Sequence, residues 1–216
     1  MSSTPRRIPP VQHRGEVRRS RILESASQAF LRHGYAGVSV DALVAGAGGS
    51  KASIYRYFGS KAALFMAVVE YLCDRFLHNL DAIDIADGPL RRRLQAILRE
   101  LVAVVASPAH VAFYRMVVEG EAHVPGAGRA WYEHGPQVWY AKLRPMLHDR
   151  AGADGRPVPP LAAEFLFDAL FARLTTQTVM LGQDAPGVDH EAVIAALVEL
   201  VLGPDGTAPA APACPA

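Results

Sequence analysis

The sequence predicts an all-α protein of about nine helices, in which three short N-terminal helices precede a larger helical bundle. Apolar residues recur at helical spacing along most of the 216 residues. Sustained alternation of polar and apolar residues, which would indicate strands, does not occur. Half of the residues are apolar, which is enough for one sizeable core or for two modest ones.

The three N-terminal helices are expected at residues 19–33, 40–45 and 50–58. Ile22, Leu23, Ala26, Ala29 and Phe30 give the first helix its apolar face. Ser39 suits the N-terminal cap of the second. The run GAGG at positions 46–49 makes a tight turn before the third. Two short helices joined by such a turn form the pattern of a helix-turn-helix, whose second helix enters the major groove of DNA.

Six further helices are expected, at residues 61–80, 89–106, 108–121, 129–150, 161–181 and 190–202. Pro89 and Pro108 mark two of the starts, because proline is tolerated in the first turn of a helix. Pro136 and Pro145 should each kink or interrupt the helix at 129–150, since proline lacks an N–H donor and clashes with the preceding turn.

These elements divide the chain into four expected segments. Residues 1–15 should be a flexible basic arm and residues 16–62 a helix-turn-helix DNA-binding domain. Residues 63–203 should form a helical domain for ligand binding and dimerisation. The Pro/Ala-rich stretch 204–216 should be a disordered tail.

Charge is unevenly distributed along the chain. Up to Ala62, ten Lys and Arg stand against three Asp and Glu, a net charge of +7, whereas the remainder carries −6. Six arginines lead into the first helix: Arg6, Arg7, Arg14, Arg18, Arg19 and Arg21. A basic segment is often only a solvated tail, but one that adjoins a folded helix pair favours a polyanion partner, with nucleic acid first. Anionic lipid is the alternative.

Several other classes of protein are not expected. No apolar stretch approaches the roughly 20 residues of a membrane span, and no secretory signal is visible, so a cytoplasmic protein without a membrane partner is predicted. Cys73 and Cys214 are too few for a disulfide framework. The histidines lack metal-ligand spacing, the glycine run matches no nucleotide-binding motif, and no catalytic constellation can be assembled. We therefore expect no metal, no cofactor and no enzyme.

The third helix carries the candidate DNA contacts. Ser50 can cap its N-terminus, which also offers partial positive charge and free N–H groups to a phosphate. Lys51, Ala52 and Ser53 occupy the first turn, from which a recognition helix reaches base edges. The side chains suited to the DNA backbone are Tyr55, Arg56, Tyr57 and Lys61.

Residues 19–65 resemble the DNA-binding domain of the TetR family of transcriptional regulators, through the segments RILESASQAF, HGYAGVSV, GAGGSK and IYRYFGSK. The resemblance implies phosphate contacts from Ser39, Tyr55, Tyr57 and Lys61, and base contacts from Lys51, Ala52 and Ser53. Gly49 departs from the family pattern, which usually has valine or a similar apolar residue there, so the turn loses a packing anchor. The segment FYRMVVEGEAHVPGAGRAWYEHGP is similar to the C-terminal domain of an AefR-like subgroup.

A ligand site is expected among aromatic residues of the C-terminal helices. Most of these rings should simply be core, but some can line a cavity for a hydrophobic or aromatic effector. The candidates are Phe76, Phe113, Trp131, Tyr132, Trp139, Phe167 and Phe171.

A homodimer is expected because two recognition helices must lie about 34–36 Å apart to enter successive major grooves. The last two helices should pair with their copies around Phe165, Leu166, Ala169, Leu170, Ile194, Leu197 and Val201. The alternative is that these residues pack within one subunit.

The predicted function is that of a regulator, most simply a repressor, which leaves a near-palindromic operator when a small molecule binds. The alternative is a helical carrier or enzyme whose basic N-terminus binds DNA without sequence preference.

Overall fold

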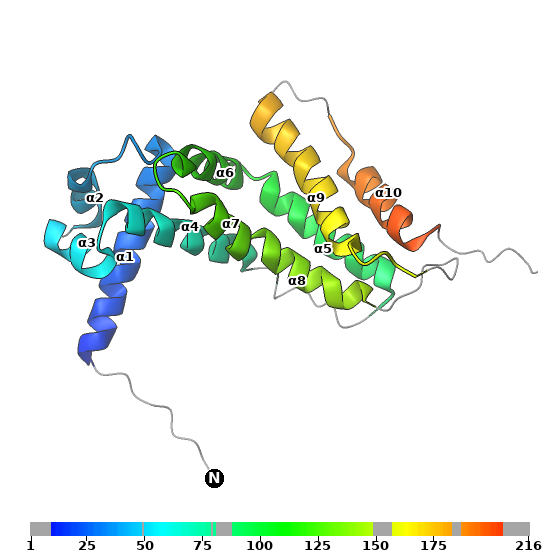
Figure 1. Cartoon of the computed structure of the whole chain (residues 1–216), viewed down its shortest axis with the longest axis horizontal. Helices are drawn as coiled ribbons and strands as arrows, with labels where there is room; N and C mark the ends of the chain where they lie inside the picture. Colours follow the sequence, from blue (N-terminus) through cyan, green and yellow to red (C-terminus); the bar gives the residue numbers. More distant parts are fainter. Residues whose placement is uncertain are drawn as a thin grey trace, which may run out of the picture. The chain divides into compact units, whose positions relative to one another are not determined.

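The structure is a computed structural model that describes residues 10–48, 50–78, 80, 88–148, 157–182 and 187–204. These residues form ten α-helices and one π-helical segment, and none of them forms a strand (Figure 1). The all-α prediction is confirmed. The helices fall into two compact units.

The first unit contains the helix-turn-helix, the helix that precedes it and three later helices. α1 packs against α2, α4 and α6, and α4 packs against α3, α6 and α7. One buried core joins these helices, with Phe30, Phe65 and Phe113 among its fully buried side chains. The bounds are α1 Pro10–His33, α2 Val40–Ala47, α3 Lys51–Phe58, α4 Lys61–Leu77, α6 Pro108–Glu121 and α7 Ala127–His134.

Close packing around Phe65 explains how the helices of this unit fit together. The ring of Phe65 meets that of Phe30 edge to face, with centroids 5.2 Å apart. Gly120 of α6 lies against the same ring, and a β-carbon there would be 2.7 Å from Cε1 of Phe65. Cys73 is buried in the same core, and desolvation raises the pKa of its thiol to about 12.

α1 begins earlier than the sequence predicts. The expected start near Arg18 is replaced by Pro10, about two turns upstream. Glu16, Val17 and Arg19 are exposed in these early turns, so no apolar stripe marked them as helical. Six residues of the expected arm at 1–15 thus belong to α1, and residues 1–9 lie outside the described part of the chain.

The helix expected at 129–150 is two helices, α7 and α8 (Pro136–Leu147). The break falls at Gly135, whose φ of −115° and ψ of −91° are not helical. Pro136 begins α8, where its missing N–H costs nothing, and Pro145 lies inside the helix. This break gives one helix more than expected.

The second unit contains the remaining helices. α9 packs against α5, α8 and α10, and α5 also packs against α10. Asp189 caps α10 by accepting a hydrogen bond from the N–H of Ala192 at 3.0 Å. The bounds are α5 Leu90–Val105, α8, α9 Ala162–Thr175, the π-helical segment η1 Thr176–Leu181, and α10 His190–Leu202. A regular helix was expected to continue through η1.

The two units do not divide the chain after residue 62, where the sequence suggested a domain boundary. α4, α6 and α7 belong to the same unit as the helix-turn-helix, while α5 and α8 to α10 belong to the other unit. Of the expected tail, residues 205–216 lie outside the described residues. Within the described ranges, no single helix has the length and apolar composition of a membrane span; α5 and α6 meet those conditions only if joined across their break.

Candidate nucleic-acid interface

α2, the turn after it and α3 form the predicted helix-turn-helix, and both helices are capped as expected. Ser39 Oγ accepts a hydrogen bond from the N–H of Ala42 at 3.1 Å. Ser50 Oγ accepts one from the N–H of Ser53 at 3.2 Å. Gly48 ends α2 in the left-handed conformation, with φ of 61°. Gly49, where a loss of packing was predicted, lies outside the described residues.

α3 has one anchored face and one free face. Ile54 is 1% exposed and fixes the helix on the core of the first unit, as Leu43 does for α2. Tyr55 is 49% exposed. Of the other predicted contacts, Ser39, Ser50, Lys51, Ala52 and Arg56 are exposed, whereas Ser53, Tyr57 and Lys61 are half-buried.

Lys51 is held by a partner that the sequence did not suggest. Its Nζ lies 2.8 Å from Oδ1 of Asp41, in the first turn of α2. The hydrogen bond and the charge of Asp41 raise the pKa of Lys51, so this residue remains a cation at neutral pH. The two side chains are 56% and 73% exposed, respectively. The ammonium group thus lies at the surface of the helix-turn-helix with an acidic neighbour.

Arg56 and Tyr57 form a local pair at the end of α3. Nη2 of Arg56 donates a hydrogen bond to the hydroxyl of Tyr57 at 2.9 Å. The guanidinium carbon lies 4.7 Å from the centroid of the same ring. Both residues are predicted to contact the DNA backbone, and each holds the side chain of the other in place without DNA.

Lys61, the first residue of α4, makes a cation–π contact with a pair of stacked rings. Its Nζ is 4.1 Å from the ring centroid of Tyr35, and burial lowers the pKa of the amine. The ring of Tyr35 in turn stacks on His123, in the turn between α6 and α7, at 5.7 Å. We call these residues the Lys61–Tyr35–His123 stack. It links a predicted phosphate contact to the α6–α7 turn inside one unit.

The α6–α7 turn is held by a carboxylate. Glu121 accepts hydrogen bonds from the N–H groups of Gly126 and Gly128, at 3.0 and 2.6 Å. These hydrogen bonds lower the pKa of Glu121. These two hydrogen bonds fix the conformation of the turn that contains His123, whose ring stacks on Tyr35.

Two arginines of α1 brace the helix-turn-helix. Nη2 of Arg18 donates a hydrogen bond to the carbonyl of Gly48 at 2.6 Å, which satisfies a free group at the end of α2. The guanidinium carbon of Arg19 lies 5.2 Å from the ring centroid of Phe58. The sequence indicated only that these residues make the segment basic; partners 30 or more positions away leave no local signal.

The predicted pocket aromatics are divided between the two units. In the first unit, Phe76 and Phe113 lie with centroids 5.4 Å apart. In the second, Trp139 and Phe171 lie against Phe167, at 6.2 and 5.4 Å. Phe113, Trp139 and Phe167 are buried, Phe76, Trp131 and Phe171 are half-buried, and Tyr132 is 41% exposed.

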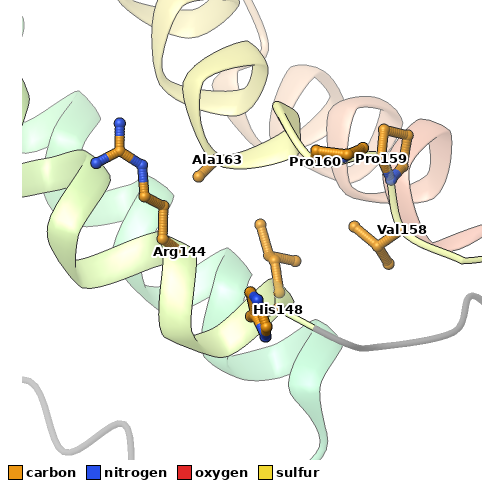
Figure 2. Close-up of a pocket in the computed structure, with 7 residues that line it drawn as sticks. Arg144, His148, Val158, Pro159, Pro160 and Ala163 are labelled. Atoms are coloured by element: carbon orange, nitrogen blue, oxygen red, sulfur yellow. The ribbon is translucent and has the colours of Figure 1, made fainter.

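A cleft of about 250 Å³ lies in the second unit, at the end of α8. Figure 2 shows Arg144 and His148 on one wall and the segment from Val158 to Pro160 with Ala163 on the other. Arg144 is engaged there, since Nε and Nη2 donate hydrogen bonds to Oε1 of Glu164 at 2.8 and 2.6 Å. No predicted pocket aromatic lines this cleft.

Four of the residues predicted for the dimer centre are packed within their own subunit. Leu166, Leu170, Ile194 and Val201 are at most 9% exposed in the single chain. These side chains, on α9 and α10, face the interior of the single chain. Phe165 is 44% exposed, while Ala169 and Leu197 are half-buried. Four exposed apolar residues were not predicted for this surface: Leu161 before α9, Met180 and Leu181 in η1, and Leu200 in α10.

Capped helices on a common core, with a basic and hydroxyl-bearing free face, define a helix-turn-helix DNA-binding protein. Residues 22–68 match the family model described as bacterial regulatory proteins, tetR family. Residues 92–203 match that of the AefR-like transcriptional repressor C-terminal domain. The chain belongs to the TetR family of transcriptional regulators, with an AefR-like C-terminal domain.

Three relatives illustrate the similarity. The regulator EthR of Mycolicibacterium smegmatis is 27% identical over 202 residues, which cover 92% of this chain and 91% of EthR. The repressor SCO4008 of Streptomyces coelicolor is 44% identical over 55 residues, which cover 26% of this chain and 29% of that protein. The solved structure of the flavonoid-responsive regulator FrrA superposes with a TM-score of 0.70 at 26% identity, over 87% of this chain and 96% of FrrA.

Two substitutions of Ser50 should have different effects on protein stability and on DNA affinity. Ser50→Ala removes the cap and should lower the free energy of unfolding by about 1 kcal/mol. Ser50→Asp keeps an acceptor for the N–H of Ser53 and should unfold in urea as the wild type does. Its carboxylate would face phosphate, so DNA affinity should fall by roughly tenfold or more. Wild-type DNA binding by Ser50→Asp would place this helix end away from DNA.

Proposed function

We propose that this regulator is a dimeric repressor that grips a near-palindromic operator through α3 and is released by a hydrophobic or aromatic small molecule. The free face of α3, next to the capped ends at Ser39 and Ser50, is the observation that carries the proposal. Helix N-termini attract phosphate, because their N–H groups and dipoles point outward.

The side chains on this face suit two kinds of DNA contact. Lys51 can donate to O6 and N7 of guanine, Ala52 can touch a thymine methyl group, and Ser53 can donate or accept at a base edge. The residues that would contact the sugar-phosphate backbone of DNA are Ser39, Tyr55, Arg56, Tyr57 and Lys61. Base readout from three small or flexible side chains is modest, so most of the affinity should come from phosphate contacts and depend steeply on salt.

A second copy of the chain is the partner that fits the exposed apolar residues of α9 and α10. Leu161 is 69% exposed and Leu200 is 70% exposed, and Phe165 lies on α9 one turn from Leu161. Large apolar side chains gathered on neighbouring helices are typical of association surfaces. We infer that these residues, with the half-buried Ala169 and Leu197, form the dimer interface. Leu166, Leu170, Ile194 and Val201, which are buried in the single chain, are not part of this proposed interface.

The effector is expected to be aromatic. FrrA, 26% identical over most of its length, is named as flavonoid-responsive. The Trp139, Phe167 and Phe171 rings of the second unit form an aromatic cluster, in which Trp139 and Phe167 are buried and Phe171 is half-buried, so an aromatic ligand would bind by displacing one of these rings and stacking on the others. The cleft at the end of α8 is a weaker candidate, since its 250 Å³ falls below the roughly 300–1,000 Å³ of ordinary ligand pockets.

The first test is binding to DNA from the region upstream of the protein's own gene, measured by fluorescence anisotropy between 50 and 200 mM salt, a range over which phosphate contacts are strongly weakened. A specific duplex should bind more tightly than a scrambled one, with a steep salt dependence. Tyr55→Phe should weaken both duplexes about three- to tenfold, because it removes a phosphate donor. Tyr71→Phe, on α4, should not. Equal binding to both duplexes by the wild type would favour the carrier or enzyme alternative.

The dimer proposal predicts that Leu200→Glu yields monomers in sedimentation equilibrium, because a charge would be buried at the interface. Operator affinity should fall with it, since one protomer cannot reach two half-sites. Val118→Glu is the matched control, because Val118 is 58% exposed on α6 of the other unit. A dimeric Leu200→Glu protein would remove α10 from the interface.

The effector proposal is tested with a flavonoid such as naringenin. It should weaken operator binding by about 5- to 150-fold, the usual range of such coupling. The chain has two tryptophans, one in each unit. Quenching should therefore persist in Trp131→Phe, which retains Trp139, and diminish in Trp139→Phe. If naringenin and related aromatic compounds leave operator binding unchanged, the proposed effector class is wrong.

A further inference from the structure

Asp41 stands out as an acidic residue on a surface that otherwise attracts DNA. From Ser25 to Val69 it is the only Asp or Glu in the sequence, and residues up to Ala62 carry a net charge of +7. We propose that Asp41 is a specificity-determining residue that holds the Lys51 ammonium away from phosphate and yields it to a base edge that accepts a hydrogen bond. This inference rests on the proposed role of α3 in reading DNA.

The geometry places the ion pair on the reading surface. Asp41 is the second residue of α2 and Lys51 is the first of α3, so the pair joins the first turns of the two helices. The distance from Nζ to Oδ1 is 2.8 Å. Both side chains are more than half exposed, and neither is locked by surrounding packing. The lysine can therefore leave the carboxylate without disturbing the core.

The pair is poorly suited to a purely structural task. Solvent-exposed ion pairs contribute little to stability. Ser39 already caps the N-terminus of α2, because its Oγ accepts a hydrogen bond from the N–H of Ala42. Asp41 adds a favourable charge near the helix N-terminus, but Asn would retain the size of the side chain. A substitution at this position should leave the fold intact and act mainly on the field at the DNA surface.

On DNA of the wrong sequence, the pair reduces attraction. The Lys51–Asp41 ion pair has almost no net charge. The pair therefore adds little to the counterion release that drives nonspecific DNA binding. If Lys51 turned to a phosphate instead, it would leave a bare carboxylate close to the polyanion. Asp41 thus lowers the affinity for every sequence in which Lys51 finds no better acceptor.

On the operator, a guanine facing Lys51 supplies two acceptors, O6 and N7. The ammonium can then exchange one hydrogen-bond acceptor for two, and the loss of the carboxylate is compensated. Asp41 would therefore reduce the affinity for the operator less than it reduces the affinity for other DNA. The carboxylate thereby widens the ratio of operator to nonspecific affinity, which is the quantity that matters when many competing sites are present.

The test compares Asp41→Asn with the wild type on the operator and on a scrambled duplex of the same composition. Asp41→Asn should tighten binding to scrambled DNA about five- to tenfold and to the operator about twofold or less, so that the specificity ratio falls. The salt slope for scrambled DNA should become steeper by about one per protomer, because Lys51 gains a phosphate. In a Lys51→Gln background, Asp41→Asn should leave the ratio unchanged.

Asp74→Asn on α4 is the matched control, because it removes an exposed carboxylate about 20 Å along the helix from Lys61. It should leave both affinities within about twofold of wild type. An equal change on both duplexes, or no difference between the Asp41 and Asp74 variants, would overturn the inference while operator binding by α3 stood. A wild-type protein that binds both duplexes alike would overturn the proposed function and this inference with it.

Discussion

The placement of α3 depends on one buried side chain. A helix of eight residues is too short to persist in water without tertiary support. Ile54 supplies that support, because it is 1% exposed and belongs to the core built around Phe30 and Phe65. Ser50 and Gly59 then satisfy the helix ends, and the N–H of Gly59 donates to the carbonyl of Tyr55 at 2.8 Å. Every DNA contact assigned to α3 presupposes this anchor.

The parts of the site that the sequence predicted are those with a local chemical signature. Caps at Ser39 and Ser50 and the order of polar residues along α3 follow from neighbours in the chain. The Lys51–Asp41 pair and the Lys61–Tyr35–His123 stack join residues 10 to 88 positions apart, and a single sequence contains no signal for them. The same holds for α1 before Arg18, whose exposed turns lack the apolar stripe by which helices were found.

Periodicity finds an apolar stripe but does not say what covers it. On α9, the sequence predicts that Leu166 and Leu170 face another subunit, but both are buried in the single chain, while Phe165 and the preceding Leu161 are exposed. The aromatic residues showed the same ambiguity, since buried rings such as Phe113 and Phe167 satisfy one another. Deciding between core and interface requires knowing which neighbours share each face, and that is a property of tertiary packing.

The shared core of the first unit has a practical meaning for anyone who wishes to transplant this DNA reader onto a foreign sensor. A chimera spliced at residue 62 would cut α4 after its second residue and remove the contact of α1 with α6, and Phe30 would lose the ring of Phe65 against which it packs. The natural cassette is discontinuous: residues 10–77 must travel together with 108–135. A replacement sensor therefore has to be joined at three points: after the end of α4, before the start of α6 and after the end of α7.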